Sequence, residues 1–221
     1  MGLPSLNRVR GGLRDLRRDA AITWSYGGVA AIWEALRARS VHWLYRRQVG
    51  ILFEEDLAMV SRGTPPAGVE IRALSDRDWG PLAQTLTTRG LERIRRRTMP
   101  GRTCLIAWRG ERPIGHTWLS ERGATPGSVP VPLPSDASYG WDLWVDPRER
   151  GRGVGSALAI ARLEYARQRG RRRAWRVVIP RNRPALRTVE KSSGGSARAI
   201  GRVTYVTFLG RRRTRYEPAS S

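Results

Sequence analysis

The stretch VDPRERGRGVGSAL, residues 145–158, decides the fold of this chain. Asp146-Pro147 ends a segment of strand composition at 139–145, and an amphipathic helical pattern runs from Val154 to about Arg169. The glycines between them let the backbone approach a ligand closely, and the first N–H groups of a helix have no acceptor inside the helix. The helix dipole adds partial positive charge at the same place, so the stretch indicates a phosphate-binding turn between a strand and a helix.

Two arginines in this turn, Arg150 and Arg152, are suited to pair with phosphate oxygens. The turn is not a Walker A loop, because no Gly-Lys-Ser/Thr follows. It also departs from the dinucleotide fingerprint G-x-G-x-x-G, because Ser156 stands where the third glycine belongs. From the glycines alone, phosphate binding and a merely tight strand-to-helix turn remain equal alternatives.

Further strands and helices alternate on both sides of this turn. Strand patterns cover residues 69–73, 103–108, 114–120, 139–145, 174–179 and 203–209, and helical patterns cover 76–87, 91–97, 154–169 and 183–191. The segment 203–209 is predicted to be the last strand. This order predicts an α/β (α+β) fold, a sheet layered with helices.

The first third of the chain predicts a basic helical extension, residues 1–66, that ends in a strand. Helical patterns cover 3–16 and 29–47, and a strand at 49–53 runs into the acidic Glu54-Glu55-Asp56. A Gly/Pro linker at 62–68 then sets the boundary to a second domain, residues 69–221. The basic helices of residues 1–47 are expected to pack on their own domain or to lie on an anionic membrane.

The location follows from what the N-terminal part lacks. The first residues contain no uninterrupted apolar region of a secretory signal. The longest uncharged apolar stretch, residues 20–33, has 14 residues, below the roughly 20 that span a bilayer. We therefore expect a cytoplasmic protein, or one held peripherally at the inner membrane face.

The charge of the chain is strongly positive and uneven. The formal net charge is +22, which points first to nucleic acid as a partner. Residues 138–221 carry 20 basic and six acidic groups, a net +14, and only Lys191 among all basic residues is a lysine. Such an arginine bias also arises from GC-rich coding. One cysteine and two histidines exclude a disulfide within the chain and a Cys/His zinc site, so no metal is predicted.

Two segments resemble the GNAT superfamily of N-acetyltransferases. Residues 145–158 are similar to its acetyl-CoA signature, R/Q-x-x-G-x-G/A, which follows a strand ending in Val and a Pro. Asn182-Arg-Pro-Ala-Leu186, followed by Glu190-Lys191 and Gly194, resembles its next block, N-x-x-A-L-x-x-x-E-K-x-G. The resemblance covers about residues 69–210. It implies a mixed, mostly antiparallel sheet, split between strands 139–145 and 174–179 so that the pantetheine arm of acetyl-CoA enters.

The same resemblance implies the cosubstrate, the reaction and the binding residues. Acetyl-CoA would donate its acetyl group to a primary amine of a small molecule, an amino sugar or a related compound. The backbone at Val145 would bond the pantetheine, and Asn182 would contact the cofactor further along. The pyrophosphate would lie on the backbone N–H groups of Arg150, Gly151, Arg152, Gly153, Val154 and Gly155, with Ser156 close behind.

At the catalytic positions the chain departs from the family pattern. Val189 stands where a tyrosine often serves as the general acid, and Ser192, Ser193 or water are the alternatives. For the base the candidates are Tyr139 and Asp142, although strand alternation predicts that Asp142 faces away from Tyr139 and Trp141. An acyl-CoA-binding protein with little catalysis, and a nucleic-acid-binding module, remain alternative functions.

Two further residues have competing interpretations. Cys104, inside a predicted strand, is interpreted as a small core residue rather than a nucleophile. His116, in the strand 114–120, is either a satisfied or exposed histidine or a group that reaches the cleft.

Overall fold

The computed structural model describes residues 45–60, 63–122, 133–208 and 211–219. The strands are β1 (Tyr45–Asp56), β2 (Glu70–Ala73), β3 (Arg102–Arg109), β4 (Arg112–Ser120), β5 (Ala137–Val145), β6 (Arg173–Val178), β7 (Arg198–Phe208) and β8 (Arg211–Pro218). The helices are α2 (Trp79–Thr85), α3 (Thr88–Arg97), α4 (Val154–Gln168) and α5 (Arg183–Ser192), with 3₁₀ helices η1 (Leu57–Met59), η2 (Asp76–Asp78) and η3 (Pro147–Glu149).

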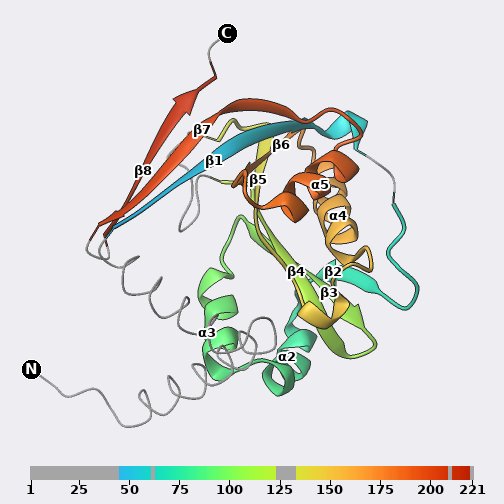
Figure 1. The fold of residues 1–221 in the computed structure, drawn as a ribbon. Coiled ribbons are helices and arrows are strands. Elements are labelled where there is room, and N and C mark those ends of the chain that lie inside the picture. Colours follow the sequence, from blue (N-terminus) through green and yellow to red (C-terminus); the bar gives the residue numbers. More distant parts are fainter. Residues whose placement is uncertain (1–44, 61–62, 123–132, 209–210, 220–221) are drawn as a thin grey trace, which may run out of the picture.

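The described strands form one sheet in the order β2-β3-β4-β5-β6-β1-β7-β8. Neighbouring strands are antiparallel except β5 and β6, which are parallel. Helices α2 and α3 lie on one face of the sheet, and α4 and α5 lie on the other (Figure 1). The predicted mixed, mostly antiparallel sheet flanked by helices is confirmed.

Each face of the sheet has its own core, as the alternation of side chains along a strand requires. On the α2/α3 face, Leu82 and Ile94 pack against Trp118 and other strand residues. On the α4 face, Val154 and Leu158 pack against Ile114 and other strand residues. Most predicted elements of residues 69–208 lie within a few residues of their expected bounds.

Strand β1 differs most from its prediction. It runs through Glu54-Glu55-Asp56, which were expected to follow the strand, and it includes residues 45–47, which were expected to end a helix. It lies between β6 and β7, with Ile51 opposite Val178 and Val49 opposite Thr204. Hydrogen bonding to a neighbouring strand stabilises the extended conformation of residues 45–47, and this outweighs their local preference for helix. The linker at 62–68 therefore separates two stretches of sequence that contribute to the same sheet.

The helices predicted at 3–16 and within 29–44 lie outside the described residues. At the other end of the chain, the prediction that 203–209 is the last strand is wrong, because β8 follows and pairs antiparallel with β7, Val206 opposite Arg213. The segment RRRTRYEP has no apolar alternation, so its strand structure depends on hydrogen bonds to β7 rather than on burial.

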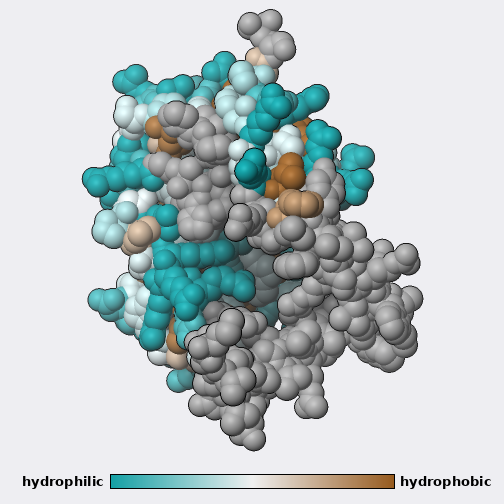
Figure 2. Space-filling model, turned by 90° about the vertical axis from the view of Figure 1, so that its left-hand side faces the viewer, coloured by the Kyte–Doolittle hydropathy of each residue, from teal (hydrophilic) through white to brown (hydrophobic). Residues whose placement is uncertain are grey.

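The described surface seen in Figure 2 is mostly hydrophilic, with small separate hydrophobic spots. In the part of the chain that the structure describes, no helix has the length and hydrophobicity to cross a membrane.

Candidate active site

Strands β5 and β6 lie side by side over only part of their length. Their pairing runs from Ala137 opposite Arg173 to Gly140 opposite Arg176 and then stops. Beyond this point β5 continues to Val145, paired with β4, and β6 continues to Val178, paired with β1. The two strands therefore follow different neighbours and separate, which opens the sheet between them where the family resemblance implied a split.

The glycine turn, which we define as residues 150–155, lies at the end of β5, where the strands have separated. Gly151 and Gly153 have φ of +78° and +83°, left-handed conformations that favour glycine. Gly153 is the N-cap of α4, and no side-chain oxygen caps the helix there. Among the described residues, no acceptor is found for the first N–H groups of α4. A Cβ at Gly151 would meet nothing within 4 Å, so this turn has room for an anionic group such as the acetyl-CoA pyrophosphate.

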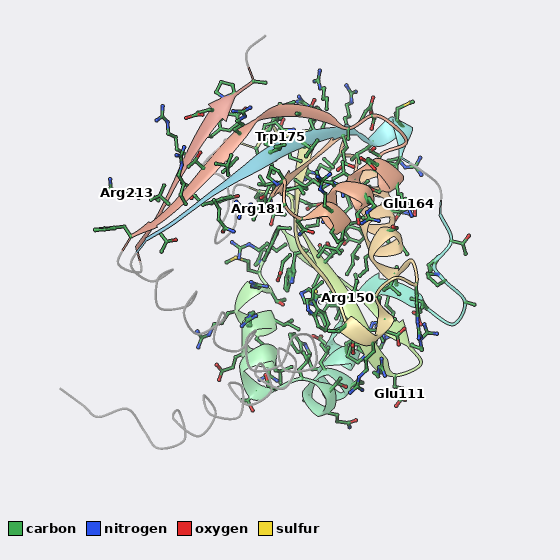
Figure 3. The ribbon with its side chains drawn as sticks, in the orientation of Figure 1. Glu111, Arg150, Glu164, Trp175, Arg181 and Arg213 are labelled. Atoms are coloured by element: carbon green, nitrogen blue, oxygen red, sulfur yellow. The ribbon has the colours of Figure 1, made fainter. Side chains whose placement is uncertain are left out.

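The turn is braced by a buried carboxylate. Glu149 accepts hydrogen bonds from Arg109 at 3.1 Å and Arg112 at 2.9 Å, both from the β3–β4 hairpin, and lies 3.6 Å from Arg152. Arg150 donates from Nε to the Val145 carbonyl at 3.2 Å, and Figure 3 shows it beside the beginning of α4. The two arginines expected to pair with phosphate thus have partners within the protein, and Arg152 still exposes 64% of its side chain.

The second predicted cofactor block lies at the start of α5. Asn182 is the N-cap of α5, and its side-chain oxygen accepts a hydrogen bond from the Ala185 N–H at 3.1 Å. This oxygen has a structural role, so the expected contact with the cofactor stays a prediction. Ser156, in the first turn of α4, is partly buried.

A β-bulge in β5 changes the face on which Asp142 lies. Trp118 is opposite Trp141, whereas His116 is opposite Trp144, so β5 has one extra residue across from β4. Asp142 has φ +49°, the only positive φ at a described residue other than glycine. The prediction that alternation turns Asp142 away from Trp141 is therefore wrong, because the bulge resets the alternation.

The bulge brings a charged cluster together on the α3 side of the sheet. Arg97, at the end of α3, forms an ion pair with Asp142, and its guanidinium lies 5.0 Å from the centre of the Trp141 ring. His116 Nε2 lies 3.5 Å from Asp142 Oδ2, and the His116 ring stacks on Trp144 with ring centres 5.7 Å apart. His116 and then Arg97 lower the pKa of Asp142 to about 2, against the opposing effect of burial. Asp142 is therefore an ionised carboxylate at neutral pH.

The other candidates for proton transfer are buried. Tyr139 is 8% exposed and packs with Leu52 and Trp175. The Ser192 hydroxyl accepts from Arg176 at 2.7 Å and donates to the Thr188 carbonyl at 2.8 Å. The Ser193 hydroxyl is buried without a hydrogen-bond partner among the described residues. Val189, at the family's tyrosine position, is also buried, so the described part of α5 offers no exposed acid there.

A buried charge cluster lies beside the point where β5 and β6 separate. Arg176, at the last paired position, binds Glu55 of β1. Arg162 of α4 donates to the Thr117 hydroxyl at 2.9 Å and lies where a side chain at Gly140 would clash. Burial raises the pKa of Glu55 and lowers that of Arg162. The sequence did not predict this cluster. One residue could have indicated it, because Arg162 falls on the face of the predicted helix that packs against the sheet.

The remaining predictions concern Cys104 and metals. Cys104 is buried in the α2/α3 core, and burial raises the pKa of its thiol, as expected of a core residue rather than a nucleophile. Among the described residues, no group of three His, Cys, Asp or Glu side chains is placed to hold a metal ion.

Comparison with known proteins assigns a family to most of this structure. The family model described as "Acetyltransferase (GNAT) family" matches residues 69–194, more than half of the chain. The match contains the glycine turn, β5, β6 and α5, and it leaves out β1, β7 and β8. No curated protein matches the chain.

Three solved structures illustrate the similarity of fold. A Drosophila protein has 12% identity and a TM-score of 0.52, and the match covers 82% of this chain and 58% of the Drosophila chain. The glucosamine N-acetyltransferase region of a fungal multi-domain β-N-acetylglucosaminidase has 12% identity and a TM-score of 0.51, covering 78% and 22%. A GCN5-related N-acetyltransferase from Sphaerobacter thermophilus has 16% identity and a TM-score of 0.50, covering 85% and 57%. The chain thus spans less than two thirds of each of these proteins.

Proposed function

The chain belongs to the acetyltransferase (GNAT) family, and from this premise we propose that it transfers an acetyl group from acetyl-CoA to a primary amine of a small molecule, with amino sugars and related compounds as the first class to test. One observation carries the proposal: the sheet opens between β5 and β6 beside a glycine turn whose helix has no side-chain cap. An elongated cofactor with a pyrophosphate in its middle fits that combination.

Bound acetyl-CoA would supply an activated acetyl thioester. The protein would hold it with the backbone N–H groups of residues 151–155 and with the backbone at Val145, and Ser156 and Asn182 would lie close by. The Arg150 N–H already donates to the Pro147 carbonyl at 3.4 Å, so its predicted contact would require a shared hydrogen bond. The net +14 charge of residues 138–221 favours the approach of such a polyanion.

The acceptor amine must lose a proton before it attacks, because a typical amine is mostly protonated at pH 7. We propose His116 as the proton acceptor and Asp142 as the residue that positions it, since a carboxylate with a pKa of about 2 is a weak base. Tyr139 lies on the same face of the sheet as Asp142 but is more deeply buried, and it stays a second candidate for proton transfer.

The surroundings of Asp142 offer one exposed aromatic ring to the acceptor. Trp144 is 41% exposed and stacks on His116, so its ring offers an apolar surface against which the carbon skeleton of the acceptor can lie beside the proposed proton acceptor. We keep the cytoplasm, with contact of residues 1–47 at the inner membrane face, as the proposed location of this reaction.

The test combines ligand binding with turnover. Acetyl-CoA should raise the melting temperature of the full chain, and a panel of amines with acetyl-CoA should release free thiol. Gly153→Glu, which places a side chain at φ +83° and a negative charge in the turn, should abolish the shift. Gly170→Glu, at φ +77° beyond the opposite end of α4, is the matched control and should retain it.

Three outcomes of this test have distinct meanings. If acetyl-CoA does not raise the melting temperature of the unmodified chain, the cofactor assignment is contradicted. If both glycine variants lose this rise equally, the role of the glycine turn is contradicted. A shift without thiol release from any amine favours an acyl-CoA-binding protein with little catalysis.

A further inference from the structure

A cavity of about 1090 Å³ lies at the end of the molecule away from the glycine turn. It is formed where the end of β1, the C-terminal end of α4 and the loop after α5 meet, at the upper right of Figure 1. Helix α4 has 15 residues, so at 1.5 Å per residue the cavity and the glycine turn are about 20 Å apart. The cavity is therefore a different place from the proposed acetyl-CoA site.

The carboxylates of this cavity all have partners within the protein. Glu54 accepts hydrogen bonds from Trp175 at 2.8 Å and Arg198 at 3.0 Å. Asp136 is held by two hydrogen bonds from Arg173, and Asp56 Oδ1 accepts from the Ala58 N–H at 2.9 Å. Trp175 is labelled near the top of Figure 3, far from Arg150. The negative groups of the lining are thus already paired.

The arginines of the cavity outnumber these carboxylates. Five arginines line it against Glu54, Asp56 and Asp136. Arg167 and Arg172 are exposed, and neither forms an ion pair with any residue that the structure describes. The cavity therefore has two exposed guanidinium groups that lie outside its described ion pairs and can bind an anion, although the positive charge of Arg172 also helps to lower the pKa of Asp136.

The loop after α5 adds backbone donors to the same cavity. Ser193 is right-handed, and the next two residues, Gly194 and Gly195, have φ of +59° and +84°. Successive N–H groups in such a turn form a concavity that binds anions. In the described part of the chain, no backbone hydrogen bond uses the N–H of Gly194 or Gly195. Gly194 and Gly195 are both exposed, and a Cβ at Gly195 would meet nothing within 4 Å.

We propose that this cavity binds a phosphorylated small molecule, with the phosphoryl group between Arg167, Arg172 and the Gly194-Gly195 backbone. Phosphate matches the fork of donors on arginine and the N–H groups of the turn together. The volume exceeds what a single phosphate fills and is suited to a nucleotide-sized compound. Met59, which is 57% exposed, offers apolar surface to the uncharged part of the ligand.

The experiment is isothermal titration of the full chain with inorganic pyrophosphate and, separately, with AMP. The titration is carried out with the original chain and with the Gly153→Glu variant, whose glycine turn carries a negative charge, so that binding common to both chains belongs to this cavity. We expect one site per chain. The double variant Arg167→Ala/Arg172→Ala should bind at least about tenfold more weakly, since it loses charge-assisted hydrogen bonds.

The matched control is Arg93→Ala/Arg96→Ala, which removes two exposed arginines from α3 and should leave binding unchanged. Tighter binding of AMP than of pyrophosphate indicates a nucleotide-like ligand, and the reverse indicates that the phosphoryl groups alone are recognised. Absence of binding by both probes overturns the proposal. An equal loss of affinity in the two double variants also overturns the proposal, because such a loss would reflect the total charge of the protein rather than this cavity.

Discussion

Asp142 and Trp141 are neighbours in the same strand, yet both side chains lie on the α3 face of the sheet. Arg97 demonstrates this, because one guanidinium forms the ion pair with Asp142 and lies over the Trp141 ring. In a regular strand, neighbouring side chains point to opposite faces. The bulge at Asp142 therefore places a carboxylate next to His116 and Trp144, at the part of β5 where β6 has already turned away.

The first prediction concerns the stability contributed by Asp142. The pKa of this carboxyl is lowered from 3.8 to about 2, so its stabilising contribution is fully present above about pH 4 and is lost as the pH falls toward 2. Asp142→Asn removes that contribution. The difference in unfolding free energy between the original chain and Asp142→Asn should shrink as the pH falls from about 4 toward 2, measured by urea denaturation at several pH values. A difference that stays constant down to pH 2 would contradict the ion pair.

The second prediction tests His116 as the proton acceptor. His116→Ala should lower kcat about 100-fold or more, the usual contribution of a general base, and leave the KM for acetyl-CoA nearly unchanged. The substitution leaves space beside Trp144, so added imidazole should restore part of the rate of thiol release. The control is the original chain, whose rate imidazole should not raise. A full loss of activity without rescue, together with a lower melting temperature, would indicate a structural role only.

The glycine turn could be predicted from the sequence because its signals are local. A strand ending at Asp146-Pro147, two glycines with left-handed φ and a helix from Val154 occupy a short stretch of chain, and each residue type has its own conformational preference. The bulge at Asp142 has no such signal. It arises from the register between β4 and β5, which depends on the packing of Trp118 on Trp141.

The position of β1 could not be predicted for a similar reason. Glu54-Glu55-Asp56 is charged, and Asp and, to a lesser degree, Glu are depleted in strands. Here Glu54 and Glu55 are 5% and 0% exposed, because Arg173, Arg176 and Arg198 from distant segments pair with them. The composition of residues 49–53 predicts a strand, but the local sequence does not indicate which strands lie next to it in the sheet.

The last prediction concerns Glu55, which joins β1 to the part of the sheet that the family model matches. Glu55→Ala leaves Arg176 and Arg162 buried without a carboxylate, and breaking a buried ion pair in this way costs about 3–5 kcal/mol. Glu55→Gln keeps the volume and should cost less, because the amide can still accept a hydrogen bond from Arg176. The control is Glu70→Ala in β2, whose exposed ion pair with Arg72 is expected to contribute less than about 1 kcal/mol. Urea denaturation of the three variants measures these costs. Equal costs for Glu55→Ala and Glu70→Ala would show that β1 is not anchored through this carboxylate.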